Sequence, residues 1–151
     1  MFVNRSEKPL LCAPWLIAML MPLPVWGALW FLSHPQPDIA WPIHAPVTFL
    51  LLVLIYPVLE EVVFRGFVQG KLLRKTMFKP LYAGITYANI FTSLLFAMTH
   101  LYAHPFIMTM LVFPPSLIFG YFRDRFDGWL LPSILLHIYY NLGYFLIFKP
   151  L

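Results

Sequence analysis

Long apolar runs separated by short polar segments dominate this chain. Stretches that contain no Asp, Glu, Lys or Arg cover residues 9–37, 39–59, 80–122 and 128–148. An α-helix needs about 20 residues to cross the hydrocarbon core of a bilayer, so the third stretch is long enough for two crossings. The pattern predicts an all-α fold, a polytopic transmembrane bundle of about five hydrophobic helices, in a single domain over residues 1–151.

The first apolar run has the position of a signal peptide, because Arg5 and Lys8 precede it. Its apolar stretch continues to Phe31, which is too long for the core of a typical signal. We therefore expect a membrane helix that is retained. Prolines in this run, and Pro114 and Pro115 in a later one, predict kinked spans, since proline removes a helical hydrogen bond. Four glycines would let helices approach one another closely: Gly66, Gly70, Gly120 and Gly143.

Composition supports lipid as the surroundings of this chain. Of its residues, 61% are hydrophobic, 19% are aromatic and 11% are charged. A soluble domain of this length cannot bury so much apolar surface, and disordered chains are polar and poor in aromatic residues. The net charge of +4 does not indicate nucleic-acid binding, because the few basic residues lie between the apolar runs. Trp15, Trp41 and Trp129 are expected at the membrane interfaces, where indole rings concentrate.

The basic residues predict the orientation of the spans. They cluster before the first run, after the second and after the fourth predicted helix. These three segments lie on one side of the membrane if the chain crosses five times, and Lys149 at the far end is the exception. The opposite loop, 33–44, carries only Asp38. By the positive-inside rule, we expect the N-terminus in the cytoplasm. The basic clusters are Arg5 and Lys8; Lys71, Arg74, Lys75 and Lys79; and Arg123 and Arg125.

Three charged residues lie near the end of the second apolar run, where lipid disfavours them. Charges within membrane segments are costly and by default mark functional sites. Glu61 and Arg65 share one helix face and can form an ion pair, whereas Glu60 points about 100° away and has no polar neighbour four residues on. Pro57 leaves the Val53 carbonyl without its helical donor, and a kink there would open space beside Glu60. A purely structural role, with the charges pairing or snorkelling to the interface, stays open.

Two further polar clusters lie in apolar runs. Phe96 and His100 are four residues apart, as are His137 and Asn141, so each pair shares a helix face. A lone histidine in a membrane helix often forms only a hydrogen bond between helices. Together, however, a carboxylate, two imidazoles and an amide can bind water, transfer protons and hold an oxyanion.

In this order, the three clusters resemble the motifs of the CPBP family, the CAAX prenyl protease and bacteriocin-processing group of glutamic-type intramembrane proteases. The motifs of that family are Glu-Glu-x-x-x-Arg, Phe-x-x-x-His and His-x-x-x-Asn or Asp. The similarity runs from about residue 56 to about residue 145, and the three motifs are specific when they occur together. They are matched here by Glu60, Glu61 and Arg65; by Phe96 and His100; and by His137 and Asn141.

The resemblance implies an intramembrane endopeptidase in the cytoplasmic membrane of a bacterium, acting on a membrane-anchored protein or peptide. Glu60 and His100 would then activate the attacking water, and His137 and Asn141 would stabilise the tetrahedral oxyanion without a covalent intermediate. A prenylated substrate and one with a C-terminal sorting anchor both remain open. Two further residues would support the site: Glu61 and Arg65.

Depth in the membrane constrains where the third helix begins. At 1.5 Å per residue, Glu60 lies about 15 Å from the cytoplasmic side. A helix that began at Leu81 would place His100 about 28 Å in, which is too deep to meet Glu60. We therefore expect the helix to begin near residues 87–89, with residues 71–86 largely at the cytoplasmic interface.

Several alternatives remain open from the sequence. Glu60, His100 and His137 could supply three zinc ligands, but the usual His-Glu-x-x-His helix is absent, and we expect neither a metal nor another cofactor. The chain could also be a non-catalytic membrane immunity or scaffold protein, or a small proton or ion carrier. A carrier would more often show repeated halves, which this sequence lacks. The expected partners are the bilayer and an anchored substrate, not nucleic acid.

Overall fold

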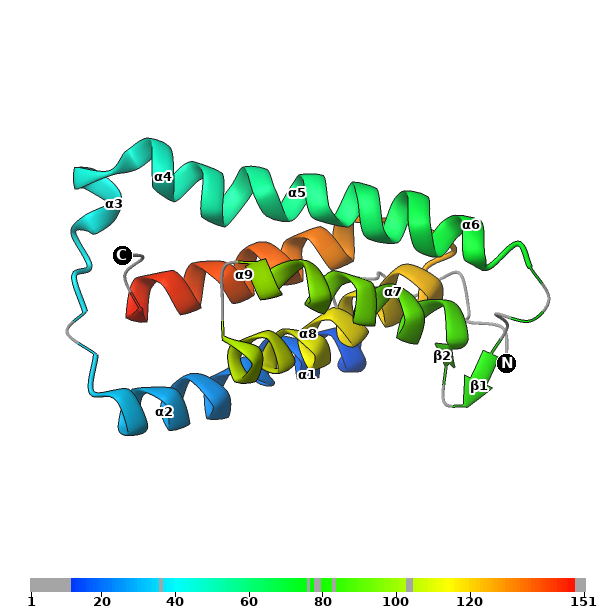
Figure 1. The fold of residues 1–151 in the computed structure, drawn as a ribbon, viewed down its shortest axis with the longest axis horizontal. Coiled ribbons are helices and arrows are strands. Elements are labelled where there is room, and N and C mark those ends of the chain that lie inside the picture. The colour runs from blue at the N-terminus through cyan, green and yellow to red at the C-terminus, as the bar shows by residue number, and fades with distance from the viewer. Residues whose placement is uncertain are drawn as a thin grey trace.

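The computed structural model of this chain describes residues 12–35, 37–75, 77, 80–82, 84–102 and 105–148. Arg5 and Lys8, expected before the first span, and Lys79, expected after the second, lie outside the described residues. Helices make up most of the described structure (Figure 1).

Two long helices form the first half of the fold. One passes through α1 and α2 over Ala13–Ser33, and the other passes through α4, α5 and α6 over Pro46–Leu72. The second contains two π-helical segments, in which hydrogen bonds join residues five apart. The bounds are Ala13–Leu20 for α1, Pro22–Ser33 for α2, Trp41–His44 for α3, Pro46–Leu50 for α4, Leu51–Ile55 for the first π segment, Tyr56–Glu61 for α5, Val62–Gln69 for the second π segment and Gly70–Leu72 for α6.

The second half begins with a short antiparallel hairpin and continues with helices. Gly84, in the hairpin turn, has φ of +84°, a left-handed conformation that glycine adopts without a steric penalty. The bounds are Pro80–Tyr82 for β1, Ile85–Thr86 for β2, Tyr87–Thr99 for α7, His100–Tyr102 for a 3-10 segment, Phe106–Arg125 for α8 and Leu131–Ile147 for α9.

Three of the described helices are long and apolar enough to cross a membrane: Ala13–Ser33, Pro46–Leu72 and α8. α9 is apolar but shorter, with 17 residues. α7 has 13 residues, which is about 20 Å of helix. The predicted all-α membrane bundle is confirmed. Only some of the described hydrophobic helices reach full spanning length, and a small hairpin precedes α7.

α9 lies at the centre of the bundle, between the long helix that contains α5 and the helix formed by α1 and α2 (Figure 1). α8 packs against both α7 and α9, and Phe119 and Phe122 of α8 join Leu136 and Tyr140 of α9 in the buried core. The Tyr140 hydroxyl donates to the carbonyl of Ala18 on α1 at 2.6 Å. The helix that carries His137 and Asn141 is therefore held on several sides.

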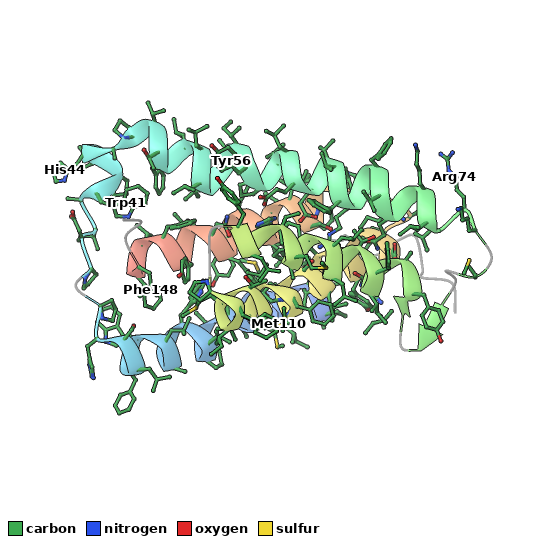
Figure 2. All side chains as sticks on the ribbon, in the orientation of Figure 1. Trp41, His44, Tyr56, Arg74, Met110 and Phe148 are labelled. Atoms are coloured by element: carbon green, nitrogen blue, oxygen red, sulfur yellow. The ribbon has the colours of Figure 1, made fainter. Side chains whose placement is uncertain are left out.

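The two ends of the bundle differ in charge. Figure 2 places Arg74 at one end and Trp41 and His44 at the other. Arg123 lies near the first end, because a Cβ added to Gly70 would be 3.0 Å from its Nη2 atom. Arg74 and Arg123, from the basic clusters after the second and fourth predicted helices, therefore lie toward the same end, as the positive-inside rule predicts.

Trp41 is not the interfacial anchor that we predicted. Its side chain is buried, and its Nε1 donates to the carbonyl of Phe145 at 2.7 Å. Phe145 lies in the last turn of α9, where helix carbonyls lack intrahelical donors, so the indole satisfies one of them. Trp15 also donates to a backbone carbonyl, that of Pro132, at 3.4 Å. Both indoles therefore serve contacts within the protein.

The predicted late start of the third helix is confirmed. α7 begins at Tyr87, and the hydroxyl of Thr86 caps it by accepting a hydrogen bond from the amide of Asn89 at 3.0 Å. The same hydroxyl donates to Asp124 at the end of α8 at 2.8 Å. This double contact fixes where α7 begins, whereas the interfacial position of residues 71–86 stays a prediction.

Candidate active site

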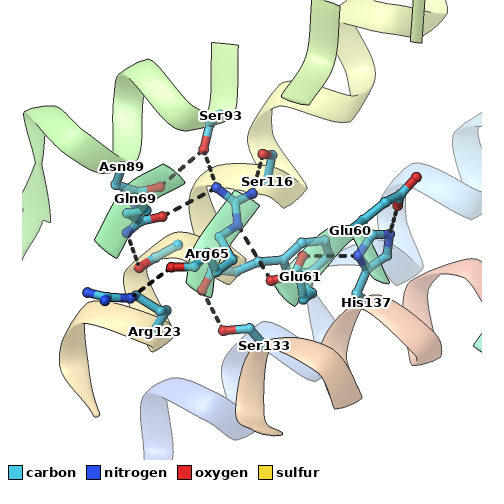
Figure 3. Close-up of polar contacts among 12 residues, drawn as sticks. Glu60, Glu61, Arg65, Gln69, Asn89, Ser93, Ser116, Arg123, Ser133 and His137 are labelled. Carbon is cyan, nitrogen blue, oxygen red and sulfur yellow. Dashed lines mark hydrogen bonds and ion pairs between the residues drawn. The ribbon is translucent and has the colours of Figure 1, made fainter. Parts of the chain in front are cut away.

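Glu61 and Arg65 form the buried ion pair that their spacing predicts. Arg65 Nε lies 3.5 Å from Glu61 Oε2, and both side chains are 0% exposed. The other oxygen of Glu61, Oε1, lies 3.0 Å from Nδ1 of His137 (Figure 3). An ionised carboxylate can only accept, so Nδ1 donates in this contact. The ion pair therefore orients the His137 ring through Glu61.

Glu60 faces the opposite edge of the same ring. Its Oε2 lies 3.5 Å from Nε2 of His137, and its side chain is 33% exposed. The ring of His137 stacks on Phe119 with centroids 4.8 Å apart and planes 20° from parallel. Glu60 thus has no partner on its own helix, as predicted, and meets one from α9. The imidazole lies between two carboxylates.

A cage of buried polar side chains surrounds the guanidinium of Arg65. Its Nη1 lies 3.4 Å from Gln69 Oε1 and 3.4 Å from Ser93 Oγ, and its Nη2 donates to Ser116 Oγ (Figure 3). All of these side chains are 0% exposed. A buried charge is tolerated only when it is paired and hydrogen-bonded. The cage supplies hydrogen-bond partners for Nη1 and Nη2, whereas Nε faces Glu61 at ion-pair distance without a hydrogen bond.

Our sequence analysis missed this cage, although part of its signal is visible. Gln69 follows Arg65 by four residues, and Asn89 and Ser93 are also four apart. Ser93 donates to Asn89 Oδ1 at 3.1 Å. The same spacing rule that identified the ion pair could have found these side chains. Ser116 offers no such signal, because only the packing of α8 brings it to Arg65.

Pro57 follows a π-helical segment, which changes the carbonyls that its missing amide affects. The segment before it is π-helical, and Tyr56 donates to Leu51, five residues back. In that register the missing amide of Pro57 leaves the Leu52 carbonyl without a backbone donor. The side-chain amide of Asn141 supplies the bond, at 3.0 Å. This contact fixes Asn141 against the long helix.

His100 lies at the end of α7, where the helix tightens into a 3-10 segment. Its Nδ1 lies 3.0 Å from the carbonyl of Phe96, and its ring centroid lies 4.9 Å from that of Phe96. The Phe96 ring also meets the edge of the His137 ring, with centroids 5.7 Å apart. Phe96 therefore separates and positions the two imidazoles.

One cavity of about 370 Å³ brings the three clusters together. Glu60 lines it from the long helix, Phe96 and His100 line it from the end of α7, and His137 and Asn141 line it from α9. The predicted site requires this meeting of segments far apart in the sequence. The remaining lining is mainly apolar and aromatic.

The zinc alternative finds no geometric support in the described residues, among which no group of three or more His, Cys, Asp or Glu is placed to hold a metal ion. Glu60, His100 and His137 share a cavity but not a set of ligand positions. That the reaction needs no metal stays a prediction.

The profile of the type II CAAX prenyl endopeptidase Rce1-like family matches residues 42–143. The match contains all six predicted site residues and begins after α1 and α2. No curated protein and no solved structure matched the chain.

Proposed function

Because the chain belongs to the type II CAAX prenyl endopeptidase Rce1-like family, we propose that it is an integral-membrane endopeptidase that hydrolyses a peptide bond of a membrane-anchored protein or peptide. The observation that carries the proposal is the meeting of Glu60, His100, His137 and Asn141 around one largely apolar cavity. An apolar cavity beside polar groups suits a substrate that is itself held in lipid.

Glu60 and His100 are the proposed bases that activate water. A carbonyl only accepts, so Nδ1 of His100 donates to Phe96, and in a neutral ring Nε2 then carries the lone pair. This tautomer suits the acceptance of a proton. Glu60 is 33% exposed and lines the cavity, so a substrate bound there can reach its carboxylate.

The proposed reaction proceeds through one tetrahedral intermediate. The water oxygen bonds to the scissile carbonyl carbon while its proton passes to Glu60, and the carbonyl electron pair moves onto oxygen. Asn141 donates its second N–H to that oxyanion, and His137, which carries a proton on both ring nitrogens in this step, donates through Nε2 while Nδ1 stays bonded to Glu61. The carbonyl then re-forms, the C–N bond breaks, and the amine leaves with the proton from Glu60.

Two contacts support the roles of the oxyanion donors. Asn141 gives one N–H to the Leu52 carbonyl, which fixes the amide plane, and the amide group carries a second N–H. The His137 ring is held by Glu61 and Phe119. Glu61 and Arg65 thus act as positioning residues, because they orient His137 and do not line the cavity.

A scaffold in which the polar groups only join helices is the main competing function. The Arg65 cage fits such a role, since its members are fully buried. Glu60 does not fit that role. A carboxylate that only joined helices would be fully buried, as Glu61 is, whereas the Glu60 side chain is 33% exposed. This difference between adjacent carboxylates favours a reactive site.

The decisive experiment uses the full-length protein purified and reconstituted in lipid vesicles. It is mixed with reporter peptides that carry either a prenylated C-terminal cysteine or an apolar C-terminal helix, and fragments are identified by mass spectrometry. Whichever peptide is cleaved shows whether the substrate is anchored by a prenyl group or by an apolar helix.

Glu60→Gln should lower the cleavage rate about 10²–10⁴-fold, the usual contribution of a general base. The matched control, Asp38→Asn, removes a carboxylate from the opposite loop and should leave the rate unchanged. Cleavage by folded Glu60→Gln protein at the wild-type rate would rule out the proposed mechanism.

Metal independence makes a separate prediction. Prolonged treatment with a strong chelator, followed by removal of the chelator, should leave the cleavage rate within about twofold of the untreated protein, because Glu60 and His100 supply the base. Metal content is measured on the same samples by elemental analysis. Loss of activity that zinc restores would overturn the prediction.

A further inference from the structure

The helix that precedes the matched family region forms one wall of the cavity. We call it the α2 wall; it consists of Met21, Pro22, Val25, Trp26 and Leu29. These side chains carry no charge, and their only polar group is the indole N–H of Trp26. A wall of this kind recognises its occupant through apolar contact area and shape.

The ring of Trp26 packs directly against the backbone of α9 at Gly143. A Cβ added to Gly143 would lie 2.1 Å from Cη2 of Trp26 and 2.4 Å from Cζ2, so only glycine allows the indole to rest there. The ring also lies against Tyr139, with centroids 5.6 Å apart. Gly143 lies two residues beyond Asn141, which is about 3 Å along the helix axis. The indole is therefore held at the level of the proposed oxyanion site.

The order of side chains around α9 shows where two of the cavity's walls lie. His137, Tyr140, Asn141 and Tyr144 line the cavity from α9, whereas residues 139 and 143 face Trp26. The long helix contributes its own lining on the other side of α9, and the two helices flank α9 in the fold (Figure 1). α9 thus forms the floor between the long helix and the α2 wall, and α8 supplies a further wall through residues between positions 108 and 119.

α1 and α2 are held differently. Tyr140 and Trp15 tie α1 to α9 through hydrogen bonds to backbone carbonyls. Within α2, the only residue classed as buried is Pro22, at its start. The contact of Trp26 with Gly143 is thus a main determinant of how closely α2 approaches the cavity.

We propose that the α2 wall determines the specificity of the site, and that Trp26 limits the size of the apolar substrate group bound beside the scissile bond. The occupant is the apolar part of a membrane-anchored substrate, since the wall is continuous with the polar cluster in one cavity. The proposal rests on the proposed function, but the binding of an apolar chain can be measured without cleavage.

The test uses the full-length protein in lipid nanodiscs and a series of alkyl alcohols that carry a terminal diazirine, with octyl, dodecyl and hexadecyl chains. After photolysis, mass spectrometry identifies the labelled residues, and competition between chains gives their relative affinities. Trp26→Ala should raise the affinity for hexadecyl relative to dodecyl about tenfold, which corresponds to burial of about two further methylenes. Trp30→Ala, one turn further along α2 and not part of the wall, is the matched control and should change nothing.

Two other variants keep the test independent of folding defects. Leu29→Phe puts a larger side chain into the cavity and should shift the chain preference toward octyl. Loss of structure cannot produce such a shift. Gly143→Ala keeps the indole but displaces it, and should resemble Trp26→Ala. Equal chain preference in Trp26→Ala and Trp30→Ala proteins would overturn the proposal.

Failure of the proposed function has a different signature. If chain selectivity depends on Trp26 but no reporter peptide is cleaved, the proposed endopeptidase activity is contradicted, and the α2 wall remains a binding site. Cleavage that depends on Glu60, with no effect of Trp26 on chain selectivity, would contradict only the role of the wall.

Discussion

At the scale of single residues, the position of His137 depends on two buried charges that neither water nor lipid headgroups reach. Glu61 and Arg65 are 0% exposed, and each meets further partners beyond the other. Removing one member of such a pair leaves an uncompensated charge, whereas replacing both leaves none. This asymmetry allows the structural role of the pair to be separated from its effect on His137.

Arg65→Met should lower the free energy of unfolding by about 3–5 kcal/mol, because Glu61 then remains charged and buried. The double variant Glu61→Leu with Arg65→Met should recover part of that loss but not the cleavage activity, since His137 loses the acceptor of its Nδ1–H. Unfolding in a denaturing-detergent titration measures the stability.

Arg74→Met is the control for this pair, because Arg74 is exposed and its loss should change stability by no more than about 0.5 kcal/mol. Equal stability of the Arg65→Met and Arg74→Met proteins would contradict the buried cage.

At the scale of elements, α7, α8 and the second π segment meet at Gly120. Gln69 donates to the Gly120 carbonyl at 3.0 Å, and Asn89 donates to the Leu117 carbonyl at 2.9 Å. A Cβ on Gly120 would lie 1.9 Å from Asn89 Oδ1 and 2.8 Å from Gln69 Oε1. The predicted close approach of helices at this glycine is confirmed, and it holds the Arg65 cage together.

Gly120→Ala should therefore destabilise the protein by about 1–3 kcal/mol, the usual cost of overpacking, and should also slow cleavage because the cage positions His137. Gly27→Ala is the matched control, since no atom lies within 4 Å of a Cβ at Gly27. Alanine at position 27 should stabilise its helix by about 0.5–1 kcal/mol. The same unfolding titration compares the two, and a neutral Gly120→Ala variant would contradict the packing.

At the scale of the whole molecule, charge distinguishes the two ends of the bundle. Arg74 and Arg123 lie toward the end where α6 stops, and the loop with Asp38 precedes the helices at the other end. The positive-inside rule predicts that the first end faces the cytoplasm. With the first helix running from that end, the N-terminus is expected on the same side.

This orientation is testable by cysteine labelling in a Cys12→Ala background. Lys75→Cys should react with a membrane-impermeant maleimide only in inside-out vesicles, and Asp38→Cys only in right-side-out vesicles. The background protein, which then has no cysteine, is the control for labelling that is not site-specific. Reversed labelling of the two positions would place the N-terminus outside.

Local sequence signals predicted much of this molecule, and their failures have a common cause. The ion pair of Glu61 with Arg65 follows from helix spacing alone. Depth along the membrane predicted that the third helix begins near residues 87–89, and α7 begins at Tyr87. The π-helical register before Pro57 and the bond from Asn141 to the Leu52 carbonyl were not predicted, because such a register depends on packing rather than on local propensity. Trp41 was assigned to the interface, but α9 offers its indole a carbonyl within the protein.

By itself, the sequence determined that this is a helical membrane protein, where its apolar segments lie and which segments carry the basic residues. It also determined the three polar clusters and their family resemblance. These features depend on composition and on spacing within one helix, which the chain carries locally. Only the tertiary structure decided that His137 lies between two carboxylates, that Ser93 and Ser116 enclose Arg65, and that Trp26 borders the cavity. Contacts between helices depend on how side chains from distant segments interlock, and no single segment specifies that packing.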